Sequence, residues 1–295
     1  MSKKISLAKF AGFCYGVKRA VETVKKLKEE NKDKNIYVLG ELIHNSQVIK
    51  ELDELGIKTV DKLPKNETGI CVIRSHGASP EVIEQIKAQG FEVVDLTCPD
   101  VKKVQQQAIQ LAKEDNFVVI VGKAEHPEVI AIKANAQLFT NNIAVATDIN
   151  ELKSVEEDIK KNKKVGVVVQ TTQRIETLQN ILVYLTTIAK EIHLVNTICA
   201  STSMRQKEAK ELAQTNDLVI VVGSKKSANT THLAEILTGI TNTIHIETAE
   251  ELDNYVDLIK NSENIAITAG ASTPQNLIDN VYKKIEGGQE WQKHN

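Results

Sequence analysis

The stretch FVVIVGKAEHPE, residues 117–128, decides the fold class of this chain. Its first five residues form an unbroken apolar run, which is typical of a strand buried on both faces of a parallel sheet. A glycine ends the run, and polar residues lead to Pro127, a residue suited to the first turn of a helix. The stretch therefore predicts a buried strand, a polar turn at its carboxyl end and a helix.

The same pattern occurs twice more, as VLGELIHN at residues 38–45 and VVGSKKSA at residues 221–228. In each copy a polar side chain stands four residues after the glycine, and a cysteine precedes the glycine by 24 to 26 residues. The polar side chains are His44, His126 and Ser227, and the cysteines are Cys14, Cys98 and Cys199. A second strand end recurs as RSHGASP at 74–80 and GASTP at 270–274, with QTT at 170–172 between them. Self-similarity at a period of just under 100 residues indicates three repeated units.

Strands and helices are expected to alternate along the whole chain, which is the pattern of an α/β protein. The expected strands are residues 5–10, 36–39, 70–73, 91–96, 117–121, 165–169, 192–195, 218–222 and 265–269. The expected helices are residues 17–31, 46–55, 80–89, 101–114, 128–134, 175–190, 202–214, 231–237 and 274–285. We predict three similar α/β units with small, mainly parallel sheets around a pseudo-threefold axis. Their predicted bounds are 1–97 with Cys14, 98–198 with Cys98 and 199–286 with Cys199, followed by a C-terminal tail, 287–295.

Composition narrows the class of protein further. There are 37 Lys and Arg against 39 Asp and Glu, a formal net charge of −2, and 41% of the residues are hydrophobic. This balance gives no support to nucleic-acid binding, and the apolar fraction is sufficient for a core. The sequence contains neither an apolar run of membrane-spanning length nor a signal peptide, so we expect a cytoplasmic protein with no membrane partner. Phosphate-binding and dinucleotide-binding glycine motifs are also absent.

The three repeated cysteines predict a metal centre. Each stands just beyond a predicted strand, and groups at the carboxyl ends of parallel strands line the binding crevice of such folds. Three equivalent units around one axis would point three thiols at one centre. Three dispersed thiolates favour an iron–sulfur cluster over zinc, which normally closes four ligands or uses a mixed set. A four-iron cluster would keep one iron without a protein ligand, and a three-iron form is an alternative. Cys71 has no repeat partner and is expected to be a buried hydrophobic residue.

Polar residues at the same strand ends are expected to share that centre, because the repeat places them at equivalent positions. Histidine, serine, asparagine and helix N-terminal N–H groups suit a phosphate ligand. This set comprises His44, His76, His126, Glu128, Thr171, Thr172, Ser227, Asn229 and Ser272.

Glu128 has two interpretations at this stage. A carboxyl group buried beside a cluster and phosphate would have a raised pKa, as a proton donor needs. An acidic residue in the first turn of a helix also interacts favourably with the helix dipole and needs no further function. The spacing alone favours neither.

With these motifs assembled, the chain resembles the LytB family of 4-hydroxy-3-methylbut-2-enyl diphosphate reductases of the non-mevalonate isoprenoid pathway. The matching motifs cover nearly the whole chain in the family's order: GFC at 12–14, G…HN at 40–45, RSHG at 74–77, TCP at 97–99, HPEV at 126–129, QTT at 170–172, TIC at 197–199 and GASTP at 270–274.

The resemblance implies a three-lobed α/β fold around a four-iron cluster held by Cys14, Cys98 and Cys199. It implies that the diphosphate is held by His44, His76, Ser227, Asn229 and Ser272. It further implies that Glu128, together with His126 and the hydroxyl of Thr171 or Thr172, handles the substrate hydroxyl and its proton. One departure is Ala228, which stands where many members have a second serine.

The implied reaction removes an allylic hydroxyl with two electrons and two protons and gives isopentenyl and dimethylallyl diphosphates. No flavin site is visible in the sequence, so a ferredoxin or flavodoxin is the expected electron donor. Two alternatives remain open: a quinolinate synthase-like enzyme with three cysteines, and a non-enzymatic iron–sulfur sensor.

Overall fold

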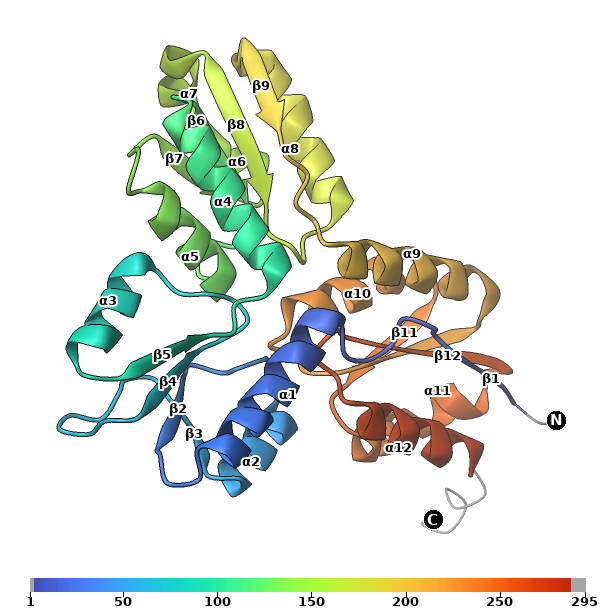
Figure 1. The fold of residues 1–295 in the computed structure, drawn as a ribbon. Helices are drawn as coiled ribbons and strands as arrows, with labels where there is room; N and C mark the ends of the chain where they lie inside the picture. The colour runs from blue at the N-terminus through green and yellow to red at the C-terminus, as the bar shows by residue number, and fades with distance from the viewer. Residues whose placement is uncertain (1–2, 288–295) are drawn as a thin grey trace. The chain divides into compact units, whose positions relative to one another are not determined.

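The computed structural model describes residues 3–287, which form three four-stranded parallel sheets flanked by helices (Figure 1). This confirms the predicted α/β class with three small parallel sheets. Residues 288–295, most of the predicted C-terminal tail, lie outside the described residues. The chain divides into two compact units, which are described separately.

The first unit contains one sheet and comprises residues 3–18, 43–50 and 200–287 of the described chain. The order of its strands is β1-β12-β10-β11. The strands are β1 (Lys4–Leu7), β10 (Leu218–Val222), β11 (Asn242–Ile246) and β12 (Asn264–Ala269). The helices wholly inside it are α9 (Ala200–Thr215), α10 (Ala228–Thr238), η1 (Ala249–Tyr255), α11 (Val256–Lys260) and α12 (Gln275–Glu286). Aliphatic side chains of these strands pack against α12 and form the core.

The second unit contains two sheets, with orders β3-β2-β4-β5 and β7-β6-β8-β9. The strands of its first sheet are β2 (Ile36–Leu39), β3 (Ile57–Val60), β4 (Ile70–Ile73) and β5 (Glu92–Asp95), and those of its second are β6 (Phe117–Val121), β7 (Ile143–Ala146), β8 (Lys164–Val169) and β9 (Glu191–Leu194). The helices wholly inside it are α3 (Pro80–Ala88), α4 (Pro99–Lys113), α5 (Pro127–Ala136), α6 (Ile149–Lys153), α7 (Glu156–Asn162) and α8 (Ile175–Ile188). Two further helices, α1 (Tyr15–Glu30) and α2 (Ser46–Glu54), begin in the first unit and continue into the second.

Equivalent strands occupy equivalent places in the three sheets. The central pairs are β2–β4, β6–β8 and β10–β12, and the strands outside the second member of each pair are β5, β9 and β1. The predicted membership of β1 needs correction: it pairs in parallel with β12, so it belongs to the sheet of residues 218–269 and not to that of residues 36–95. The order of the repeats is therefore circularly permuted, because β1, the first strand of the chain, is an edge strand of the sheet that the last repeat forms. The predicted boundaries at residues 98 and 199 stay predictions.

The structure also adds β3, β7 and β11, which were not predicted. All three lie at the same edge position of their sheets. The burial of their residues is mixed, and residues of β7 and β11 alternate between buried and more exposed positions.

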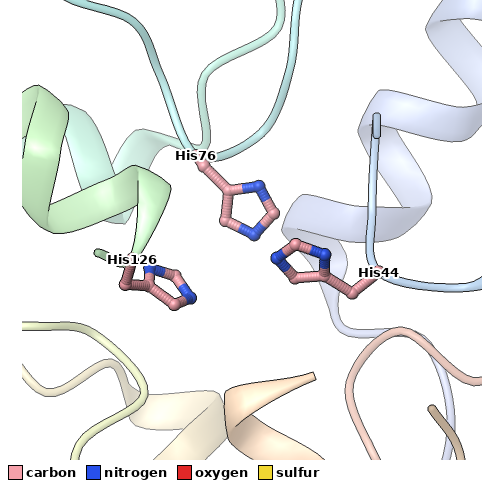
Figure 2. A group of neighbouring side chains, drawn as sticks. All are labelled: His44, His76 and His126. Atoms are coloured by element: carbon pink, nitrogen blue, oxygen red, sulfur yellow. The ribbon is translucent and has the colours of Figure 1, made fainter. Parts of the chain in front are cut away.

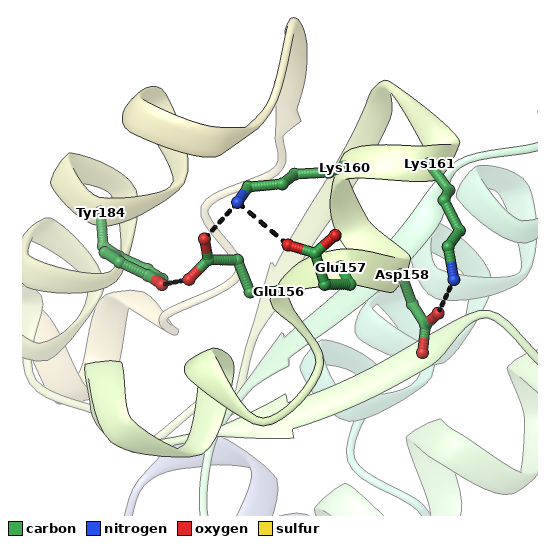
Figure 3. A network of polar contacts seen from close by, with 6 residues as sticks. All are labelled: Glu156, Glu157, Asp158, Lys160, Lys161 and Tyr184. Atoms are coloured by element: carbon green, nitrogen blue, oxygen red, sulfur yellow. Dashed lines mark hydrogen bonds and ion pairs between the residues drawn. The ribbon is translucent and has the colours of Figure 1, made fainter.

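An exposed polar network holds α7 against α8 (Figure 3). Tyr184 donates a hydrogen bond to Glu156, which also pairs with Lys160. Lys160 and Glu157 form a second pair, and Asp158 pairs with Lys161. These pairs, three or four residues apart, support a short helix on the surface. Among the described residues, the structure has no helix that is both long and apolar enough to span a membrane.

Candidate functional site

Each of the three repeated cysteines lies in the loop between an edge strand, β1, β5 or β9, and the helix that follows that strand. Cys14 follows β1 and precedes α1, Cys98 follows β5 and precedes α4, and Cys199 follows β9 and precedes α9. All three are half-buried, and none of them forms a disulfide. Cys98 and Cys199 are in the second unit, and Cys14 is in the first.

The backbone hydrogen bonds of the cysteines repeat as well. The N–H of Cys14 donates to the carbonyl of Ala271 at 3.1 Å, that of Cys98 to Ser75 at 2.9 Å, and that of Cys199 to Thr171 at 3.0 Å. The three acceptors are equivalent, because each stands two residues after the end of β12, β4 or β8. The backbone of each of the three cysteines is thus held by an equivalent hydrogen bond.

Cys71 differs from the other three cysteines in its place in the fold and in its burial. It lies inside β4 and is fully buried, and burial raises the pKa of its thiol to about 11. A thiol with this environment is poorly suited to bind a metal as thiolate. The structure confirms its predicted place in the core.

In the second unit, Glu128 lies in the first turn of α5 with 1% of its surface exposed. Its two carboxyl oxygens accept hydrogen bonds from the N–H of Thr171 at 2.7 Å and from the hydroxyl of Thr171 at 2.8 Å. Burial raises the pKa of Glu128 to about 7, although the two bonds from Thr171 act in the opposite direction. A carboxyl group with this pKa can both hold and release a proton at neutral pH.

Thr171 joins Glu128 to a cysteine. Its N–H and hydroxyl contact Glu128, while its carbonyl accepts the N–H of Cys199. The sequence left open whether Thr171 or Thr172 faces a ligand. The Thr171 hydroxyl is bonded to Glu128 and keeps lone pairs that can accept from a ligand, so which of the two threonines faces a ligand stays open.

His126 is the N-cap of α5, and its Nδ1 accepts the N–H of Glu128 at 3.2 Å. A backbone N–H can only donate, so Nδ1 carries no proton and the neutral ring is protonated at Nε2. The ring of His76 lies edge-on to that of His126 with 5.5 Å between centroids, and the two residues have ring nitrogens within 4.8 Å of each other (Figure 2). His44, also drawn in Figure 2, belongs to the first unit.

In the first unit, the strand ends of β10 and β12 bring three predicted residues together. The Ser272 hydroxyl lies 3.4 Å from that of Ser227 and donates to the carbonyl of His44 at 3.2 Å. Ser227 is the N-cap of α10, but its side chain makes no capping hydrogen bond.

Asn229, one residue into the first turn of α10, is buried with 3% of its surface exposed. Its Oδ1 lies 3.5 Å from the Thr202 hydroxyl, and its Nδ2 has no hydrogen-bond partner among the described residues. A buried amide donor without a partner is costly unless a ligand accepts from it. This group of residues is therefore suited to an oxygen-rich anion.

No role was predicted for Gln170, although it belongs to the Gln-Thr-Thr motif. Its side chain is fully buried and connects the turn after β6 to Thr172. The available signal was a polar residue directly after the buried run of β8, at a strand end.

These observations define a class: a three-sheet α/β protein with three equivalent cysteines outside any disulfide, a buried carboxyl of raised pKa and a turn whose polar groups suit an anion. Comparison with known proteins gives the family. Residues 5–286 match the family model described as LytB protein. A protein of Geobacter sulfurreducens named 4-hydroxy-3-methylbut-2-enyl diphosphate reductase is 41% identical over 284 residues, which cover 96% of this chain and 97% of that protein. The chain belongs to the LytB family.

Two solved structures are similar. One, described as (E)-4-hydroxy-3-methyl-but-2-enyl diphosphate reductase, the terminal enzyme of the non-mevalonate pathway, has a TM-score of 0.71 and 36% identity and covers 97% of this chain and 99% of that one. The other, the E-1-hydroxy-2-methyl-but-2-enyl-4-diphosphate reductase of Plasmodium falciparum, has a TM-score of 0.85 and 28% identity and covers 95% and 86%.

Proposed function

We propose that this protein reduces (E)-4-hydroxy-3-methylbut-2-enyl diphosphate to isopentenyl and dimethylallyl diphosphates. The allylic carbon–oxygen bond breaks, two electrons and one proton are added to the allyl group, and a second proton converts the departing hydroxyl to water. The observation that carries this proposal is the set of hydrogen bonds made by Thr171. Its N–H and hydroxyl bind the buried carboxyl of Glu128, and its carbonyl binds the backbone N–H of Cys199. A proton donor is thereby fixed next to a proposed metal ligand.

The proposed cofactor is a [4Fe–4S] cluster held by Cys14, Cys98 and Cys199, with one iron that lacks a protein ligand. The donor set fits this group, because the three cysteines are outside any disulfide, are half-buried and have equivalent backbone hydrogen bonds. When bound, the cluster supplies the electrons and a Lewis-acidic iron. A three-iron form is expected after oxidation.

The diphosphate is assigned to His44, His76, Ser227, Asn229 and Ser272. Support comes from the first unit, where the Ser227 side chain makes no capping hydrogen bond and the buried Asn229 Nδ2 has no partner within residues 3–287. Both can donate to phosphate oxygens. Ala228 is half-buried beside Ser227 and offers no hydroxyl, so this chain binds the phosphate with fewer side-chain donors on this turn.

Glu128 supplies the proton that turns the hydroxyl into water. While Glu128 is ionised, the Thr171 hydroxyl donates to it; once Glu128 is protonated, its O–H can donate to Thr171 and the hydroxyl can turn elsewhere. His126, with Nε2 protonated, and the hydroxyl of Thr171 or Thr172 complete the set of groups near the substrate hydroxyl.

Electrons are proposed to come from a reduced ferredoxin or flavodoxin. Membership of the LytB family disfavours the quinolinate synthase-like alternative. An activity assay distinguishes the proposed reductase from a non-enzymatic iron–sulfur sensor. Protein purified without oxygen and loaded with iron and sulfide should form both products when a reduced viologen dye supplies electrons. Iron-loaded protein that binds the substrate without converting it would contradict the proposal.

A further inference from the structure

Arg19 holds the main chain directly before Cys98. Its Nη2 donates hydrogen bonds to the carbonyls of Leu96 and Thr97 at 3.0 and 2.7 Å, and all four residues belong to the second unit. Arg19 lies in α1, the helix that follows Cys14, and the two carbonyls are 77 and 78 residues further along the chain. The loop of one proposed cluster ligand is thus held by a cation from the helix that follows another.

Arg205, in α9, makes a similar contact in the first unit. Its Nη2 donates to the carbonyl of Gly12 at 2.5 Å, two residues before Cys14. Its Nη1 donates to the carbonyl of Ser201 at 3.2 Å, two residues after Cys199. With 5% of its surface exposed, Arg205 is a buried cation, and a buried charge is stable only where acceptors surround it. Because the donor is charged, the carbonyl of Gly12 is held more strongly than a neutral donor would hold it.

A second residue of α9 binds the same loop. The two carboxylate oxygens of Glu208 accept hydrogen bonds from the N–H groups of Lys9 and Phe10 at 2.7 and 2.9 Å. Glu208 stands three residues after Arg205, so the two side chains are neighbours on one face of the helix. The main chain before Cys14 is therefore attached to α9 by both a cation and an anion.

The two arginine contacts occur at equivalent positions. Leu96 and Gly12, which accept the hydrogen bonds, each stand two residues before a proposed ligand. Arg19 and Arg205 stand five and six residues after a different proposed ligand. A contact that recurs in this way in two units points to a function shared by both positions, and a cysteine is what the two positions share.

We propose that Arg19 and Arg205 are positioning residues for the cluster, holding the main chain before Cys98 and Cys14 so that both thiols are in place before iron binds. This inference rests on the proposed function, in which these cysteines are cluster ligands. A guanidinium has donors only and is no iron ligand, so each arginine acts through the loop of its cysteine. Ligands that are ordered in advance lose less conformational entropy on binding. The cluster should therefore be held for longer.

Hydrogen exchange of main-chain amides, measured in the cluster-free full-length protein, reports the local opening of each loop. Arg205→Met should speed exchange at the amide of Cys14 and leave exchange at Cys98 unchanged. Arg19→Met should have the opposite effect. The expected increase is about ten- to hundredfold, because a charge-assisted hydrogen bond to the loop is lost. General destabilisation would instead speed exchange at both cysteines and in the buried strand β6, and that result would overturn the proposal.

Iron release connects the loops to the cluster. A chelator is added without oxygen to the cluster-loaded protein, and both methionine variants should lose iron about ten- to hundredfold faster than the wild type. Arg205→Lys and Arg19→Lys should lose iron more slowly than the methionine variants, since lysine keeps the charge and a donor for the carbonyl. The matched controls are Lys207→Met and Lys26→Met, which remove an exposed cation from α9 and from α1 and should release iron at the wild-type rate.

The outcomes separate this inference from the proposed function. Wild-type protein that loads no iron and sulfide would contradict the proposed cofactor, and the inference would fail with it. A wild type that loads the cluster, together with methionine variants that release iron no faster, would overturn the inference alone. If Arg205→Met does not fold, Glu208→Gln takes its place. That variant keeps an acceptor for only one of the two loop N–H groups and should speed exchange at Cys14 and iron release by a smaller factor.

Discussion

Replacing Glu128 with glutamine should change how the stability of the cluster-free protein depends on pH. The Glu128 carboxyl is buried, and burial raises its pKa from the ordinary value of 4.5 to about 7. Between these two values the folded protein holds a proton on Glu128 that the unfolded chain has released. The contribution of Glu128 to the free energy of unfolding therefore falls as pH rises from about 4.5 to about 7, and it is constant above that pH.

The shift from 4.5 to about 7 corresponds to roughly 3 kcal/mol at about 1.4 kcal/mol per pH unit. Glutamine does not titrate, so Glu128→Gln lacks this fall. The stability of the variant relative to the wild type should accordingly increase by about 3 kcal/mol between pH 4.5 and pH 7.5. Urea unfolding at a series of pH values, followed by circular dichroism, measures the difference directly.

The control is Glu125→Gln, because Glu125 is an exposed carboxyl on the same turn. Its stability profile should run parallel to that of the wild type. A stability difference between Glu128→Gln and the wild type that stays constant over this pH range would show that the buried carboxyl does not bind a proton on folding.

Three further predictions address the other parts of the site. Serine at Cys14, Cys98 or Cys199 should lose the cluster, whereas Cys71→Ser should retain it; iron and sulfide analysis decides, and normal iron in Cys98→Ser would exclude that residue as a ligand. Prolonged exposure to air should remove iron and activity, because an iron without a protein ligand is open to oxidants; a full cluster and full rate after exposure, checked by electron paramagnetic resonance, would contradict this. Alanine at Asn229, His44 or His76 should weaken substrate binding about ten- to hundredfold through loss of a charge-assisted hydrogen bond; calorimetry with an unchanged affinity would remove that residue from the diphosphate site.

The sequence predicted the central strands well, because they are buried on both faces and read as continuous aliphatic runs. The runs at 117–121 and 218–222 match β6 and β10 residue for residue. The edge strands β3, β7 and β11 were missed, since four or five residues of mixed burial resemble a loop. The predicted sheet membership of β1 was wrong for a different reason. A repeat in the sequence does not reveal with which sheet the first strand of the chain pairs, and β1 pairs with β12.

Within the site, local spacing identified the residue types but not their hydrogen bonds. The positions of Glu128 and Thr171 at strand ends were visible, whereas their mutual contact spans 43 residues and depends on β6 and β8 being neighbours. The orientation of Gln170 is set by Lys123, which is 47 residues away. Such contacts follow from sheet pairing, which a single sequence does not specify.

The most direct test of the proposed chemistry is single-turnover reduction of the substrate by the reduced, cluster-loaded protein, with Glu128→Gln compared with the wild type and rates normalised to iron content. The proposal predicts that the variant binds substrate and keeps its cluster while the rate falls by about a hundred- to ten-thousandfold, as expected for loss of a general acid. A rate close to that of the wild type would contradict the assignment of the proton to Glu128.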